Sequence, residues 1–144
     1  MLVFALGAAI PQVAHAQAAP EGLWRTISDT DGRPRGLVRL QMSGGTLIGI
    51  AEGSLVPGET ANAVCAKCPG ELRNKPLKGM RILWGLKPSA RNPLVFEGGR
   101  ILDPDSGRIY NAKVTLSPDN ASLTMRGYLG LESVGRSQTW MRHP

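Results

Sequence analysis

The chain has 144 residues, with 17 Lys and Arg, 11 Asp and Glu, and a formal net charge of +6. A chain of this length suits one domain. Hydrophobic residues make up 42% of it and charged residues 19%, which is too apolar for a disordered protein. No apolar run reaches the roughly 18 residues that a membrane-spanning helix needs. Length and composition therefore indicate one globular domain without a membrane span.

An apolar leader occupies the first 16 residues. Residues 2–9 read LVFALGAA without a charge, and the small-x-small triplet Ala14-His15-Ala16 follows Pro11. This is the form of a secretory signal peptide, although the usual basic n-region is missing. We therefore expect a signal peptide over 1–16, cleaved near Ala16, and a single exported domain over 17–144.

Short runs with strand character, separated by glycine and proline, follow the leader. The 18 Gly and 11 Pro leave little room for long helices. Alternation of apolar and polar residues predicts about eight strands, at 22–27, 36–42, 46–52, 80–87, 94–97, 108–117, 122–130 and 135–142. It is clearest in 80–87, where one face is predicted to hold Met80, Ile82, Trp84 and Leu86.

Turn-forming residues join the predicted strands, as at Asp31-Gly32 and Asp105-Ser106-Gly107. Hairpins between neighbours in sequence imply an antiparallel meander. Eight short strands can stack as a sandwich or close into a barrel, and only closure removes the exposed edge strands. We therefore expect an all-β fold, an antiparallel up-and-down eight-stranded barrel.

The first and last predicted strands carry a G-x-W and a W-x-R. Gly22 and Trp24 open the first strand, and Trp140 and Arg142 end the last. This pairing is similar to that of calycins such as lipocalins, in which the G-x-W packs across the closed barrel end beneath an Arg from the final strand. The alternative is that both tryptophans are ordinary core residues.

Further motifs extend this resemblance over residues 21 to 142. They are the C-x-x-C of Cys65 and Cys68, residues 75–79, residues 98–104 with Gly107 and Tyr110, Arg126-Gly127-Tyr128 with Gly130, and Gly135-Arg136 before Trp140. In this order they resemble the bacterial domain-of-unknown-function family 2147. The resemblance implies an exported, lipocalin-like small β-barrel of Gram-negative bacteria, periplasmic or secreted. It implies no established activity and transfers no catalytic residue.

Cys65 and Cys68 lie in the longest irregular segment, residues 57–78. In an exported protein two cysteines are most simply a disulfide, which would pin this loop. A redox-active C-x-x-C is the alternative, but nothing after Cys68 indicates the helix that lowers a thiol pKa. A zinc site lacks further ligands, and residues 103–107 depart from the calcium-loop pattern. We expect the disulfide, no metal and no cofactor.

One face of each of the last two strands is polar, cationic and aromatic. If Trp140 points inward, Arg136 and Gln138 follow it by parity, and a cation inside an apolar barrel would select an acidic amphiphile. The candidate ligand-binding residues are Arg126, Tyr128, Arg136 and Gln138. The alternative is that these arginines are solvated on the outside of the barrel.

These features favour binding over catalysis. His143 is the only histidine beyond the leader and is next to last, so no serine or cysteine has a base to activate it. The basic residues are scattered and the aromatic content is 5%, which argues against nucleic-acid binding. The net charge of +6 favours contact with an anionic envelope surface. We expect a lipocalin-like module for a small apolar or amphipathic ligand, which is acidic if the cationic face points inward. The alternatives are a packed envelope scaffold for protein interactions, or a thiol-redox protein using Cys65 and Cys68.

Overall fold

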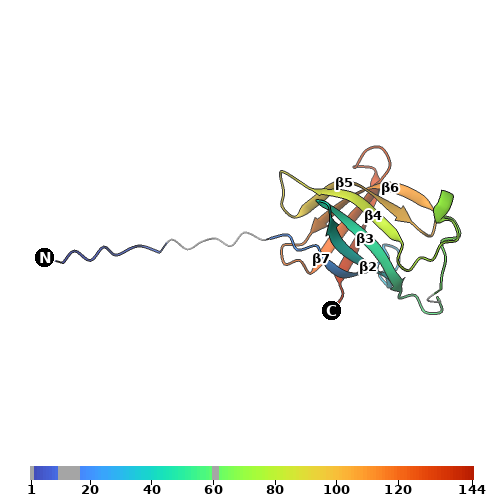
Figure 1. The fold of residues 1–144 in the computed structure, drawn as a ribbon, viewed down its shortest axis with the longest axis horizontal. Helices are drawn as coiled ribbons and strands as arrows, with labels where there is room; N and C mark the ends of the chain where they lie inside the picture. Colours follow the sequence, from blue (N-terminus) through green and yellow to red (C-terminus); the bar gives the residue numbers. More distant parts are fainter. Residues whose placement is uncertain (1, 10–16, 60–61) are drawn as a thin grey trace.

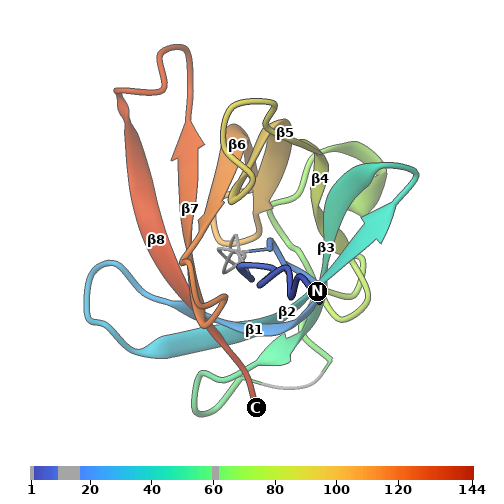
Figure 2. The same ribbon diagram turned by 90° about the vertical axis from the view of Figure 1, so that its left-hand side faces the viewer.

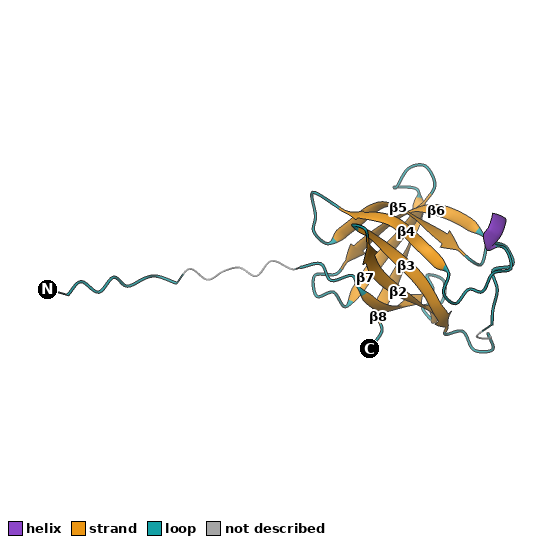
Figure 3. Ribbon diagram, viewed as in Figure 1, coloured by secondary structure: helices purple, strands orange, loops and turns teal. Residues whose placement is uncertain are grey.

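A closed barrel of eight antiparallel strands dominates the computed structural model, which describes residues 2–9, 17–59 and 62–144 (Figure 1). The strands are β1 (Gly22–Ile27), β2 (Pro34–Ser43), β3 (Thr46–Ser54), β4 (Arg81–Pro88), β5 (Val95–Asp103), β6 (Arg108–Leu116), β7 (Ser122–Tyr128) and β8 (Gly135–Arg142). Each strand pairs with its neighbour in sequence, and β1 pairs with β8 to close the ring. Within the described residues, one 3-10 turn, η1 (Gly70–Leu72), lies in the loop between β3 and β4, as Figure 3 shows.

The predicted all-β, up-and-down, eight-stranded barrel is confirmed, and β1 and β8 have the predicted bounds. The predicted cleavage site near Ala16 lies outside the described residues. In the described part of the chain, no helix is long and apolar enough to cross a membrane.

Strand β5 is longer than predicted, because Gly98 and Gly99 do not end it. The register with β6 shifts between Phe96 and Gly99, so the glycines form a bulge inside the strand. A Cβ atom at Gly99 would lie 2.5 Å from the carbonyl oxygen of Trp84, which only glycine avoids. In the sequence, Gly98-Gly99 is typical of a turn, but in the structure these glycines allow β5 to approach β4 closely.

The predicted single face of residues 80–87 is wrong, because Ile82 and Trp84 alternate with inward Leu83, whereas Leu86 also faces inward. Leu83 and Leu86 are both fully buried, whereas Trp84 lies opposite exposed Arg100 on the outer wall. Between them, Gly85 has a φ of 74° and resets the alternation. A continuous period-2 pattern could not anticipate this break.

The barrel has two different ends, as Figures 1 and 2 show. Alternating strand directions bring the β1–β2, β3–β4, β5–β6 and β7–β8 connections to one end, here the loop end. The other three turns lie with Gln17 and the C-terminus at the terminal end. Buried inward residues fill this terminal half: Trp24, Leu40, Leu47, Leu86, Val114, Leu116, Leu123 and Trp140. An eight-stranded barrel is just wide enough for such a packed interior.

Arg142 closes the terminal end. Its guanidinium carbon lies 4.3 Å from the centroid of the Trp24 ring, a cation–π contact. Its nitrogens donate hydrogen bonds to the carbonyl oxygens of Ala19, Glu21 and Asn120. One side chain at the end of β8 thereby fixes the segment before β1 and the β6–β7 turn.

Gly22 is required where Arg142 crosses the chain. A Cβ atom at Gly22 would lie 2.7 Å from Nη1 of Arg142, and its φ is 130°. The indole N–H of Trp24 donates to the carbonyl oxygen of Pro20 at 2.9 Å, which draws the same segment over the barrel end. The structure thus brings Gly22, Trp24 and Arg142 together at one end of the barrel.

Arg142→Met should lower the free energy of unfolding by about 3 kcal/mol, because it removes the cation–π contact and leaves three carbonyl groups without their donor. Urea unfolding followed by tryptophan fluorescence measures this loss. Arg91→Met, at an exposed loop position, is the matched control and should change stability by less than about 0.5 kcal/mol. Equal stabilities for the two variants would contradict the role given to Arg142.

Candidate functional site

The interior of the barrel changes character toward the loop end. Several inward-facing residues there are small or polar: Thr26, Gly36, Tyr110, Gly127, Arg136 and Gln138. All are partly exposed except Arg136, whose side chain is 74% exposed, whereas most inward residues of the terminal half are buried. Solvent therefore reaches the inner face of the barrel at the loop end.

A stretch of inner wall without a side chain lies at Gly127. A Cβ atom placed there would lie 3.7 Å from Cβ of Tyr110 and 4.0 Å from Cγ2 of Ile101. Across the β7–β8 ladder, Gly127 lies opposite Arg136. An aromatic residue and an aliphatic side chain therefore border this stretch, and the backbone of Arg136 lies beside it. We call Ile101, Tyr110, Gly127, Arg136 and Gln138 the inner rim.

Gln138 is oriented by the core beneath it. Its Oε1 accepts a hydrogen bond from the indole N–H of Trp140 at 2.7 Å. In the described part of the chain, the amide nitrogen of Gln138 has no protein partner, so its two N–H groups remain able to donate. Trp140, in the packed half of the barrel, thus positions the amide N–H donors of Gln138 at the rim.

Arg136 faces the mouth of the barrel in an exposed ion pair. Its Nε and Nη2 donate to Oδ2 of Asp29 in the β1–β2 loop, at 3.0 and 2.6 Å. The Arg136 side chain is 74% exposed and that of Asp29 is 33% exposed. Because exposed ion pairs contribute little stability, a second anion can compete with Asp29 for this guanidinium group.

Arg126 and Tyr128 do not share a face with Arg136 and Gln138. They lie opposite Ser137 and Gly135, which alternate with the inward residues of β8. Directly opposed residues of an antiparallel pair point to the same side, so Arg126 and Tyr128 are on the outer wall. The structure therefore divides the four predicted ligand-binding residues between the inside and the outside.

On the outer wall, Arg126 organises the β7–β8 loop. Its guanidinium group donates to the carbonyl oxygens of Glu132 and Ser133 and to Oγ of Ser137, at 3.1 to 3.2 Å. These partners belong to the protein itself, which gives Arg126 a structural role in this conformation.

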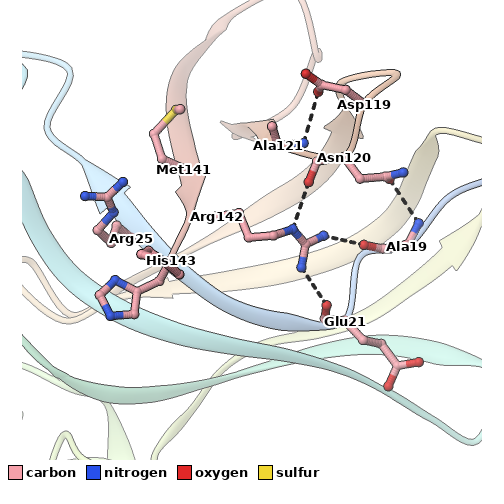
Figure 4. Close-up of a pocket in the computed structure, with 10 residues that line it drawn as sticks. Ala19, Glu21, Arg25, Asp119, Asn120, Ala121, Met141, Arg142 and His143 are labelled. Atoms are coloured by element: carbon pink, nitrogen blue, oxygen red, sulfur yellow. Dashed lines mark hydrogen bonds between the residues drawn. The ribbon is translucent and has the colours of Figure 1, made fainter.

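A groove of about 720 Å³ lies at the terminal end, outside the barrel (Figure 4). Nε of Arg25 and Nδ1 of His143 are buried there without a hydrogen-bond partner among the described residues. Hydrogen bonds from the Ser117 hydroxyl and the Ala121 N–H hold the pKa of Asp119, on the groove edge, below its usual value. Figure 4 shows Arg142 directed at its three carbonyl partners. This groove is thus part of the barrel closure and lies away from the inner rim.

The family assignment follows from the sequence of the whole barrel. Residues 22–142 match the profile of a family described as "Uncharacterized protein conserved in bacteria (DUF2147)". The chain belongs to the DUF2147 family. Among curated proteins, none matches it significantly.

A solved structure supports the lipocalin-like fold of this DUF2147 chain. It is protein HP1028 from Helicobacter pylori, described as belonging to the lipocalin family. The two share 20% identity at a TM-score of 0.76, over 89% of this chain and 85% of the other. At this identity the likeness shows the fold alone.

The long loop of the DUF2147 barrel covers part of its outer wall. Leu102 has outward parity, since its neighbour Ile101 faces the rim, yet it is only 1% exposed. It belongs to one buried cluster with Cys65 and Cys68, which form a disulfide. Gly107 lies so close to the backbone of Lys67 that it admits no Cβ atom. The disulfide loop is therefore a flap packed against the β5–β6 hairpin.

Both sulfur atoms of this flap are shielded. Cys65 is 1% exposed and Cys68 is fully buried. Thiol–disulfide exchange requires access to sulfur, so burial opposes the redox alternative. In the described ranges, no group of three or more His, Cys, Asp or Glu side chains is placed to hold a metal ion.

Tyr110 and Gly127 stand in the family motifs, but the sequence alone does not assign them to the interior. Their inward direction follows from the β5–β6 and β6–β7 ladders, which match Tyr110 to Ile101 and Gly127 to Ala112. Tyr110 lies diagonally next to Gly127 on the neighbouring strand. An aromatic residue beside a glycine on adjacent strands is the signal that could have indicated the rim.

Replacing both Cys65 and Cys68 by alanine should lower the free energy of unfolding by about 2 kcal/mol, from the entropy of closing this short loop. Loss of the flap should also expose Leu102 and increase binding of a hydrophobic dye. The comparison uses urea unfolding of the double variant and of wild type with and without reductant. Unchanged stability and dye binding would show that the flap does not depend on the disulfide.

Proposed function

We propose that this DUF2147 protein binds a small amphipathic molecule with an acidic group at the loop end of its barrel. The observation that carries the proposal is the exposure of inward-facing residues at that end, above a terminal half that is filled with buried side chains. In lipocalin-like barrels a ligand enters where the interior meets solvent, and this chain offers that condition at the inner rim.

The rim residues divide into an apolar and a polar part. Ile101 and Tyr110 can contact a hydrocarbon or ring above the bare wall at Gly127. Arg136 and the amide nitrogen of Gln138 supply donors for an acidic group, and hydrogen bonds to a charged acceptor are the stronger kind. Since the terminal half is packed, the bound part of the ligand must be short.

Export is part of the same proposal. The apolar leader and the Ala14-His15-Ala16 triplet support cleavage near Ala16, and a buried disulfide suits the oxidising periplasm or exterior. The side chain of Asn120 binds the carbonyl oxygen of Gln17 and the N–H of Ala19. Contacts with the barrel thus begin directly after the proposed cleavage site.

A binding role fits the positions of the reactive groups better than an enzymatic one. His143 lies on the outer side at the terminal end, beside Arg25 in Figure 4, and contributes nothing to the inner rim. The second candidate function is a scaffold that binds other envelope proteins. The packed terminal half favours it, because a filled barrel does not require a ligand.

Decanoate and decanol, which differ in their head group, test the binding proposal. Gly127→Leu should lower the affinity for both ligands at least tenfold, because its side chain fills the space at the bare wall. Arg136→Gln should lower the affinity for decanoate alone by about tenfold, which corresponds to the loss of one charge-assisted hydrogen bond. Titration calorimetry measures both affinities. Arg100→Gln, on the outer wall, is the matched control and should change neither.

Native mass spectrometry of the gently purified protein supplies the second readout. A co-purifying acidic amphiphile that is lost in Gly127→Leu would support the proposal. Ligand-free protein that binds neither probe would instead favour the scaffold. Circular dichroism of each variant establishes that the barrel is folded.

A further inference from the structure

The β7–β8 loop carries a cluster of exposed apolar side chains. Leu129, Leu131 and Val134 are 57%, 73% and 69% exposed. Apart from residues 2–9, these are the most exposed large hydrophobic residues of the described chain. The others, such as Met42 at 37%, stand singly. Three such side chains within six residues are unusual on a surface that only meets water.

This loop is held in place from below. Arg126 binds the carbonyl oxygens of Glu132 and Ser133, and Nζ of Lys113 pairs with Glu132 at 2.8 Å. Inside the loop, the N–H of Val134 donates to the carbonyl oxygen of Leu131 at 3.0 Å. Polar groups of the loop thus bind the barrel while its apolar side chains stay exposed, so the loop is organised before it meets a partner.

Cationic and aromatic residues surround the base of the loop. Lys113 and Arg126 lie opposite each other on the outer wall, and Arg136 lies at the start of β8. Beside them an outward row of opposed residues crosses four strands: Trp84, Arg100, Asn111 and Tyr128. Tryptophan and tyrosine favour the interface between lipid and water, and arginine and lysine are attracted to anionic lipid head groups.

We propose that the β7–β8 loop docks the barrel on an anionic phospholipid bilayer, with Leu129, Leu131 and Val134 inserted among the lipids. Figure 2 shows this hairpin projecting farther from the ring than its neighbours. A projecting apolar tip above a cationic base suits a soft, negatively charged surface. The net charge of +6 adds long-range attraction to such a surface.

The proposal goes beyond ligand binding and does not depend on it. The inserted side chains belong to the loop, whereas the proposed ligand contacts lie on the inner face. If both hold, the mouth of the barrel opens beside the bilayer, with Arg136 at the start of β8 close to the head groups.

Cosedimentation with vesicles tests the docking. The purified protein should bind vesicles of phosphatidylcholine and phosphatidylglycerol (3:1) but not of phosphatidylcholine alone, and binding should weaken at high salt. The triple variant Leu129→Ser, Leu131→Ser, Val134→Ser should bind at least tenfold more weakly, since three apolar side chains no longer leave water. Met42→Ser, at the opposite end of the barrel, is the matched control and should bind as wild type does.

Three results would overturn the proposal. The first is that the protein does not bind the phosphatidylglycerol vesicles, and the second is that wild type and the triple variant bind them equally. The third is that light scattering shows a wild-type dimer, which the triple variant does not form, and that neither protein binds vesicles. The last would assign the loop to a second copy of the chain. Gly127→Leu should still bind vesicles, so failure of the ligand proposal and failure of docking remain distinguishable.

Discussion

The contact between Arg142 and Trp24 is the one on which the rest of the barrel depends. The β1–β8 ladder contains only three opposed pairs, against eight in the β2–β3 ladder, so the seam has few hydrogen bonds of its own. Arg142 supplements it by stacking on Trp24 and by binding carbonyl groups of two other segments. Without a closed seam, β1 and β8 would each present an open strand edge to solvent.

Because the terminal end of the barrel is closed and packed, a ligand can reach the interior from the loop end. Two tryptophans and the leucines around them fill the terminal half, whereas inward-facing residues at the loop end are partly exposed. Gln138 joins the two halves, because its side chain accepts the indole N–H of Trp140 from the core and belongs to the rim. The core therefore orients one polar side chain of the rim, which suits selective binding of a small molecule.

At the loop end, one apolar part of the outer wall is covered and another is exposed. Over β5, the disulfide flap covers Leu102 and removes an apolar side chain from water. At the β7–β8 loop, apolar side chains remain exposed while Arg126 and Lys113 occupy the polar groups beneath them. A protein that buries one outward leucine under a flap has the means to cover others. The proposed docking on a bilayer would cover Leu129 and Leu131 instead.

Local rules determined most of the architecture from the sequence alone. Alternating residues and turn signals predicted eight antiparallel strands, because these features act between neighbours in the chain. The packing of the G-x-W beneath a terminal Arg was expected from the resemblance to calycins, since it joins the two ends of the chain. Tertiary structure decided the rest. The side of the wall on which Trp84 lies depends on Gly85, and the separation of Arg126 from Arg136 depends on strand register. Parity within one strand cannot say which face is inside, since that is set only when neighbouring strands pair and the barrel closes.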